Sequence, residues 1–170
     1  ICNNAAVSPL MSRALKGMPS DAPPMGVLGC LLSAMSCYNS ELATNDRARD
    51  VENFDQAAAA AISQTATAAA LSYRISKGLE GNRPDSSLSF ADNFLHLMLS
   101  EEGKPYEPVA EVSRALDLML LLHADHEQNC STSTVRMVAS GGANLFASIG
   151  AGSNALWGPA HGGANMAVIK

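Results

Sequence analysis

Two histidines stand where a run of leucines ends and polar residues begin. The segment 123–136 reads HADHEQNCSTSTVR, with His123 and His126 three residues apart. Histidines at this spacing can bind one metal ion from a single helical turn, but metal sites need three or four converging donors. The other histidines are His96, in an apolar run, and His161, beside glycines. Because an imidazole can also donate a hydrogen bond to a carboxylate or carbonyl, we expect histidines that hold an anionic small molecule and no metal.

A second histidine-centred segment, GPAHGGAN at 158–165, has the composition of a rigid turn. Proline and glycine around His161 let a ligand approach the backbone, and the turn leads into a predicted helix whose free N–H groups favour negative charge. A neutral imidazole there can donate a hydrogen bond to an oxygen that gains charge in a transition state. Taken alone, the segment also fits a surface turn capped by a histidine. Together with 123–136, it indicates a catalytic site.

Residues 150–155, GAGSNA, match the glycine spacing of a dinucleotide-binding fingerprint. That fingerprint requires a preceding strand and an acidic residue about 20 positions further on, within a βαβ unit. The sequence predicts neither feature. We therefore attribute these small residues to close packing between helices, and we expect no bound cofactor.

Composition argues against two classes of partner. The formal net charge is −5, with 11 lysine and arginine residues and no basic stripe, whereas nucleic acids and anionic membrane surfaces need clustered cations. The longest apolar runs, 25–38 and 115–122, are shorter than the roughly 20 residues that span a bilayer, and we interpret them as buried helices. We expect neither a nucleic-acid partner nor a membrane partner.

The cysteines and the chain ends indicate the context of the chain. The four cysteines form no C-x-x-C pair, which favours reduced thiols in an intracellular compartment, and the apolar neighbours of Cys30 and Cys37 predict core positions. The chain begins at Ile1 rather than methionine and stops at Lys170 within an apolar-periodic run. We therefore expect an internal segment of a larger protein.

Apolar periodicity predicts an all-α fold without an internal domain boundary. Apolar residues recur every three or four positions, and no segment shows the sustained alternation of a strand. Start signals include Asp21 as a cap before two prolines, a capping box formed by Ser89 and Asp92, and Asn144 as a cap. The predicted helices cover residues 8–17, 21–45, 50–77, 89–102, 108–122, 131–139 and 145–157, with another beginning near 161.

The longest predicted helix, 50–77, is rich in alanine. Alanine is the best helix former, so a helix is favoured over a flexible linker. Small residues at alternating steps of four and three let a second helix approach closely, which predicts a helix–helix or subunit contact. The predicted seam consists of Phe54, Ala58, Ala61, Thr65, Ala68, Ser72 and Ile75.

The two histidine segments carry a family resemblance. HADHEQNCSTSTVR at 123–136, followed by LWGPAHGGAN at 156–165, resembles the paired signature of the citrate synthase family, in its bacterial and peroxisomal-type branch. Further blocks that resemble the family are SDAPPM (20–25), SYR (72–74) and LSFADNFL (88–95). The resemblance implies a multi-helical, citrate-synthase-like large domain. It also implies that residues 1–170 form the central part of that domain, without the N-terminal region and the C-terminal small-domain part.

The resemblance implies condensation of acetyl-CoA with oxaloacetate through an enol or enolate, followed by hydrolysis of citryl-CoA, in the tricarboxylic acid or glyoxylate cycle. His126 matches the histidine that binds oxaloacetate, His161 matches the catalytic histidine that stabilises the enolate, and Ser131 matches the hydroxyl residue that orients it. The family's carboxylate base, second catalytic histidine and substrate-binding arginines have no counterpart in this sequence. We therefore expect the isolated segment to be inactive.

The resemblance also implies an assembly and a location. The family forms homodimers through antiparallel helix pairs, here matched by helices near 24–44, 51–77, 145–157 and 161–170. It requires no metal and no cofactor, since acetyl-CoA is a substrate. The expected location is the cytoplasm in a bacterium, or the mitochondrial or peroxisomal matrix in a eukaryote.

Three alternatives to this activity stay open at the level of sequence. The first is 2-methylcitrate synthase, which uses propionyl-CoA, because one methylene changes pocket binding by only about 1–3 kcal/mol. The second is a noncatalytic helical dimerisation module that retains the motifs. The third is a His/Asp metal hydrolase.

Overall fold

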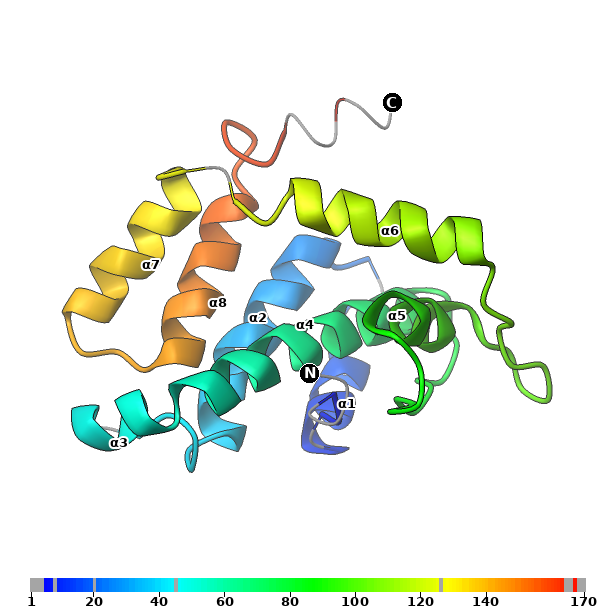
Figure 1. The fold of residues 1–170 in the computed structure, drawn as a ribbon, viewed down its shortest axis with the longest axis horizontal. Coiled ribbons are helices and arrows are strands. Elements are labelled where there is room, and N and C mark those ends of the chain that lie inside the picture. The colour runs from blue at the N-terminus through cyan, green and yellow to red at the C-terminus, as the bar shows by residue number, and fades with distance from the viewer. Residues whose placement is uncertain are drawn as a thin grey trace. The chain divides into compact units, whose positions relative to one another are not determined.

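A computed structural model describes residues 5–7, 9–19, 21–44, 46–125, 127–163 and 167 (Figure 1). Its helices are α1 (Pro9–Lys16), α2 (Pro24–Tyr38), α3 (Arg47–Glu52), α4 (Phe54–Ser76), α5 (Phe90–Leu99), α6 (Ala110–Leu122), α7 (Cys130–Ser140) and α8 (Leu145–Leu156). The described residues form no strand, only an isolated bridge between Glu101 and Lys104. The all-α prediction is confirmed. None of the described helices is long and apolar enough to cross a membrane.

The chain divides into two compact units, each of which joins segments that are distant in the sequence. The first unit comprises residues 1–21 and 59–126, and the second comprises 22–58 and 127–170. Helix α4 passes from the second unit to the first between Ala58 and Ala59. Periodicity along one helix gives no information on which distant segments pack together, so the division had no sequence signal.

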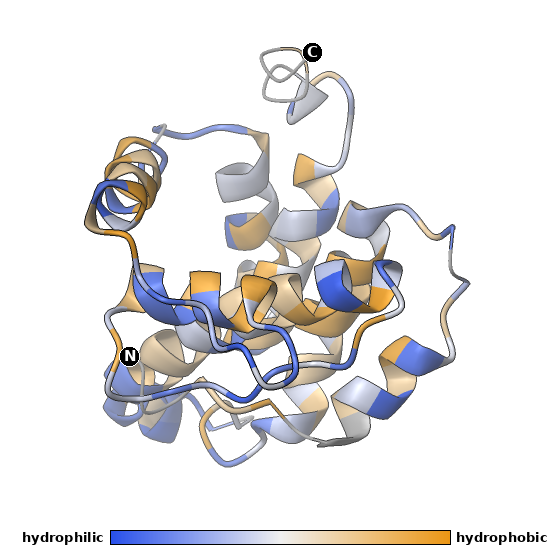
Figure 2. Cartoon of the chain, turned by 90° about the vertical axis from the view of Figure 1, so that its right-hand side faces the viewer, coloured by the Kyte–Doolittle hydropathy of each residue, from blue (hydrophilic) through white to orange (hydrophobic). Residues whose placement is uncertain are grey.

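The first unit contains α1, most of α4, α5 and α6. Arg74 of α4 is 5% exposed, and its guanidinium donates hydrogen bonds to the carbonyls of Glu80, Met98 and Ser100, at 2.5, 3.2 and 2.6 Å. These bonds join α4 to the end of α5 and to the loop between them. Figure 2 shows apolar residues along the helices. The buried apolar residues of this unit include Met11, Leu15, Ala60, Ala68, Ala70, Ala91 and Leu97.

Helix α6 differs from its prediction as a buried helix. It begins at Ala110 and has no buried residue, and Leu121 and Leu122 are 70% and 65% exposed. Its link to α5 is polar, because Ser113 donates a short hydrogen bond to the Asp92 carboxylate. The apolar run therefore predicts the helix correctly but not its burial in this chain.

The alanine-rich helix begins later than predicted and buries a different face. Asp46 caps α3 by accepting hydrogen bonds from Ala48 and Arg49, and Asn53 then separates α3 from α4. Of the predicted seam only Ala61 and Ala68 are buried, whereas Phe54 is 54% exposed. Because almost every face of such a helix is small, periodicity does not select one. The buried residues of α4 are Ala57, Ala60, Ala61, Ser63, Thr67, Ala68, Ala70, Leu71 and Arg74.

In the second unit, α8 packs against both α2 and α7. Helix α2 begins at Pro24 after Pro23, without a side-chain cap, so the predicted cap at Asp21 is wrong. It ends at Tyr38 rather than near residue 45, and the side chain of Asn39, the residue after it, donates a hydrogen bond to the Met35 carbonyl.

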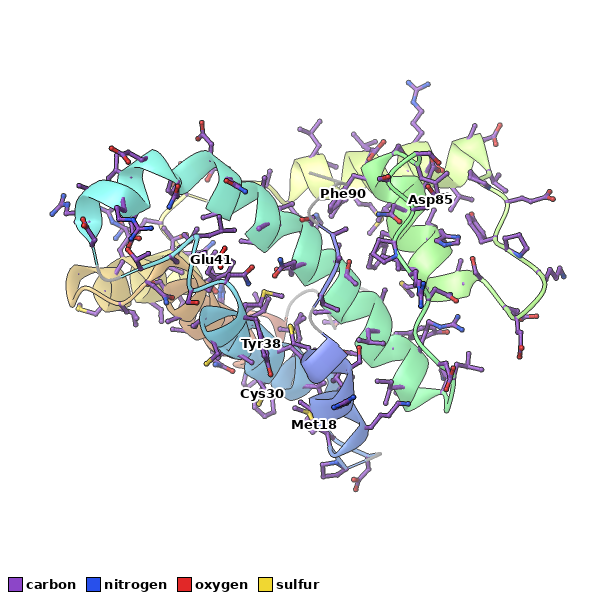
Figure 3. The ribbon with its side chains drawn as sticks, turned by 90° about the horizontal axis from the view of Figure 1, so that it is seen from below. Met18, Cys30, Tyr38, Glu41, Asp85 and Phe90 are labelled. Atoms are coloured by element: carbon purple, nitrogen blue, oxygen red, sulfur yellow. The ribbon has the colours of Figure 1, made fainter. Side chains whose placement is uncertain are left out.

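The two cysteines of α2 are exposed, not core residues as predicted. Figure 3 labels Cys30 and Tyr38 on this helix. Cys30, Ser33 and Cys37 follow the helical spacing of three and four, and all three are exposed. The buried residues Gly29, Leu31, Leu32 and Met35 define another face. The prediction of burial, which was based on the apolar sequence neighbours of both cysteines, is therefore wrong.

Candidate active site

His161 lies on a tight turn that follows α8. Asn144 caps this helix by accepting a hydrogen bond from the N–H of Ala147, as predicted. After α8 ends, the N–H groups of His161 and Gly162 both donate to the Gly158 carbonyl, at 2.9 and 3.0 Å. A Cβ on Gly162 would lie 2.2 Å from the carbonyl oxygen of Leu156, so only glycine fits there. The predicted turn is confirmed, and most of the helix predicted from 161 lies outside the described residues.

Ser131 lies in the first turn of α7. Asn129 caps this helix, since its side-chain oxygen accepts a hydrogen bond of 2.9 Å from the N–H of Thr132. The preceding backbone turns sharply at Glu127, a non-glycine residue with φ of 57°, and the N–H of Asn129 donates to the Glu127 carbonyl. The cap and this turn fix where α7 starts and therefore where Ser131 points.

The fold brings Ser131 and His161 together from segments 30 residues apart. Ser131 Oγ lies 2.8 Å from His161 Nε2 and 2.9 Å from the carbonyl oxygen of Gly152, and both side chains are half-buried. A hydroxyl has one proton, and a carbonyl can only accept. Ser131 therefore either donates to Gly152 and accepts from a protonated Nε2, or donates to an unprotonated Nε2. In the second arrangement a neutral His161 carries its proton on Nδ1.

Of the two histidines of the first predicted segment, the structure describes only His123. His126, the predicted oxaloacetate ligand, lies outside the described residues. His123 ends α6, and its Nδ1 lies 2.7 Å from the carbonyl oxygen of Met119. In the described part of the chain, no group of three or more His, Cys, Asp or Glu side chains could hold a metal ion.

The glycine-rich run 150–155 lies inside α8, where the predicted role in helix packing is confirmed. A Cβ on Gly150 would lie 2.6 Å from Ser33 Oγ of α2, and a Cβ on Gly152 would lie 2.5 Å from Val135 Cγ2 of α7. Both glycines are buried. Sequence reasoning missed the Gly152 carbonyl as a partner of Ser131, because a backbone oxygen carries no residue-type signal.

A pocket of about 850 Å³ lies in the first unit, and its described lining residues include no histidine. Residues of α1, α4 and the loop 78–84 line it. Its buried Thr67 donates to the Ala5 carbonyl, and Asn82 donates to the carbonyls of Leu97 and Ser100. The side chains of Thr67 and Asn82 therefore already have hydrogen-bond partners within the protein.

Comparisons with known proteins indicate the same family as the two histidine segments. A family model described as "Citrate synthase, C-terminal domain" matches residues 1–170. Citrate synthase 1 of Mycobacterium tuberculosis is 44% identical over 160 residues, which cover 94% of this chain and 36% of that protein. A glyoxysomal citrate synthase of Cucurbita maxima is 38% identical over 174 residues, covering 100% of this chain and 34% of that protein.

A solved structure is also similar. The crystal structure of citrate synthase from Pyrobaculum aerophilum matches with a TM-score of 0.77 and 32% identity, over 98% of this chain and 41% of that chain. The chain spans about a third of the length of the curated relatives it matches, at 36% and 34% of them.

Proposed function

The chain belongs to the citrate synthase family, and from this premise we propose that the protein condenses acetyl-CoA with oxaloacetate and hydrolyses citryl-CoA to citrate and CoA. The observation that carries the proposal is the contact of 2.8 Å between Ser131 Oγ and His161 Nε2. It joins the two signature segments in one arrangement that can hold an imidazole in a fixed orientation.

The proposed reaction needs a hydrogen-bond donor at the thioester oxygen. The methyl group of acetyl-CoA is a very weak acid, so a base that removes its proton requires stabilisation of the charge that develops on the carbonyl oxygen. His161 supplies this donor from Nδ1 when Ser131 donates its proton to Nε2. The resulting enol carbon attacks the ketone of oxaloacetate, and water then cleaves the thioester. The base is a carboxylate for which residues 1–170 offer no match to the family pattern.

His126 is the proposed ligand of oxaloacetate, to which its imidazole donates a hydrogen bond. Neither metal nor cofactor has a part in the proposal, because the donor for the thioester oxygen is an imidazole and the acyl group arrives on CoA. Both curated relatives described above are named citrate synthases, which supports acetyl-CoA over propionyl-CoA.

We further propose a homodimer through helices near 24–44, 51–77, 145–157 and 161–170. Exposed apolar side chains on these helices support it, among them Ile62, Tyr73 and Trp157, which are 51%, 41% and 51% exposed. The proposed location is the cytoplasm of a bacterium or the mitochondrial or peroxisomal matrix of a eukaryote. A bacterial and a glyoxysomal relative support this range.

The test uses the protein expressed from its complete coding sequence. Release of free CoA is followed with a thiol reagent in the presence of acetyl-CoA, with and without oxaloacetate, and with propionyl-CoA as the competing substrate. We expect CoA release that requires oxaloacetate, is faster with acetyl-CoA than with propionyl-CoA, and is unchanged by EDTA. Absence of release would support the dimerisation module, and loss of activity with EDTA would support the metal hydrolase.

A further inference from the structure

Gly152 lies where α8 comes closest to the start of α7. It is buried, and a Cβ built on it would lie 2.5 Å from Val135 Cγ2, 3.4 Å from the Ser131 carbonyl oxygen and 3.9 Å from Ser131 Cβ. Nonbonded carbon atoms normally sit about 3.5–4.0 Å apart. The absence of a side chain at 152 therefore sets the distance between the two helices at the level of Ser131.

The backbone carbonyl of the same residue lies against the Ser131 hydroxyl. Ser131 Oγ lies 2.9 Å from the Gly152 carbonyl oxygen and 2.8 Å from His161 Nε2. One hydroxyl thus lies between a backbone acceptor on α8 and the imidazole that follows α8. Any increase in the distance between α7 and α8 moves Ser131 away from both partners together.

We infer that Gly152 is a positioning residue for the catalytic imidazole, acting through Ser131; the inference rests on the proposed function. An alanine at 152 needs roughly 1 Å more room against Val135 to reach normal contact. The same displacement lengthens the contact between Ser131 and His161 from 2.8 Å to roughly 3.8 Å, beyond hydrogen-bond range. His161 then loses the partner that fixes its orientation, and a misplacement of about 1 Å can reduce a rate about 100-fold.

Val135 is the residue that can compensate. Its Cγ2 is the atom that the new methyl group would meet at 2.5 Å, and Val135→Ala removes that atom. The next contact, 3.4 Å to the Ser131 carbonyl oxygen, needs only a small adjustment. Alanine is also a better helix former than glycine. The double variant Gly152→Ala/Val135→Ala should therefore fold with α7 and α8 at their original separation.

The experiment compares four forms of the complete protein: wild type, Gly152→Ala, Val135→Ala and the double variant. We expect kcat for CoA release to fall about 30–100-fold in Gly152→Ala, with KM for oxaloacetate within about twofold of wild type. Val135→Ala should stay within about threefold of wild type, and the double variant should recover to within about fivefold. Near-ultraviolet circular dichroism and Tm confirm that each form is folded.

A double-mutant cycle between Gly152 and Ser131 tests whether Gly152 acts through Ser131. In a Ser131→Ala background, Gly152→Ala should change kcat by less than about threefold, because the contact it disrupts is already absent. The ¹⁵N shift of His161 Nε2 provides a readout without turnover, and it should move in Gly152→Ala and return in the double variant. If wild type releases no CoA, the proposed function fails, while this shift still decides whether Gly152 positions the ring.

Three results would overturn the inference. The first is a kcat for Gly152→Ala within twofold of wild type. The second is a fall in kcat on Gly152→Ala that is as large in the Ser131→Ala background as in the wild-type background. The third is a folded double variant with no recovery of kcat or of the Nε2 shift. If Gly152→Ala does not fold, the Nε2 shift of the double variant is compared with that of Val135→Ala; equal shifts support the inference, and unequal shifts overturn it.

Discussion

Replacement of Ser131 by alanine removes a hydroxyl that contacts His161. Its oxygen lies 2.8 Å from Nε2, so the variant loses a hydrogen bond between two half-buried groups. Such a bond contributes about 1–1.5 kcal/mol, equivalent to about tenfold in rate if it is lost only from the transition state. Because the ring also becomes free to turn, and displacement of a donor can cost about 100-fold, we expect kcat to fall about 10–100-fold.

The assay is CoA release by the complete protein at saturating acetyl-CoA, with KM for oxaloacetate measured alongside. We expect KM to stay within about threefold of wild type, because Ser131 acts on the ring rather than on oxaloacetate. Ser133→Ala is the matched control, since Ser133 is an exposed serine two residues further along α7. A kcat for Ser131→Ala within twofold of wild type, or an equal loss in Ser133→Ala, would refute the reasoning.

Three further predictions concern the framework of the site and of the chain. Arg74→Met should lower the free energy of unfolding by about 2–4 kcal/mol in urea titrations, because it removes the three hydrogen bonds by which a buried guanidinium joins α4 to the end of α5 and to the loop between them; a change below 1 kcal/mol would contradict this. Hydrogen bonds from Ser113 and Ser89 lower the pKa of Asp92 in the folded protein. The ionised Asp92 carboxylate therefore stabilises the fold at pH values above its unfolded-state pKa of about 3.9, and this stabilisation is lost as the pH falls through the lower pKa of the folded protein. Asp92→Asn should therefore weaken the pH dependence of Tm below about pH 4, and an unchanged profile would exclude this role. Asn129→Ala removes the cap of α7 and should cost about 1 kcal/mol in the same titrations, whereas no change would argue against the cap.

Local signals in the sequence predicted the helices well. The hydroxyl of Ser89 accepts from the N–H of Asp92 as the capping-box pattern requires, and Asn144 caps α8. These caps depend on residues three apart, which lie next to each other in any helix. The start of α2 was harder to predict, because Pro23 fixes the backbone there and leaves Asp21 without a capping role.

Burial was less predictable, because it depends on segments distant in the sequence. Cys30 and Cys37 have apolar neighbours, yet they share the exposed face of α2 with Ser33. Leu121 and Leu122 belong to a strongly apolar helix, yet both are exposed in this chain. An apolar sequence favours burial but does not supply the surface against which a residue packs.

In the candidate site, too, local residue types were predictable, whereas contacts between distant segments were not. The residue types around Ser131 and His161 indicated hydrogen-bond chemistry, and the family resemblance paired the two residues, which are 30 positions apart. The contribution of Gly152 was not predictable, since it depends on a backbone carbonyl and on the approach of α7 to α8.

The measurement that tests the central claim most directly is CoA release by His161→Ala in the complete protein, with acetyl-CoA and oxaloacetate both present. We predict that wild type releases CoA only when oxaloacetate is added, and that His161→Ala releases none above background while keeping its fold. His126→Ala, measured beside it, should mainly raise the oxaloacetate concentration required. Wild-type kinetics in folded His161→Ala would contradict the assignment of His161 as the donor that stabilises the enolate.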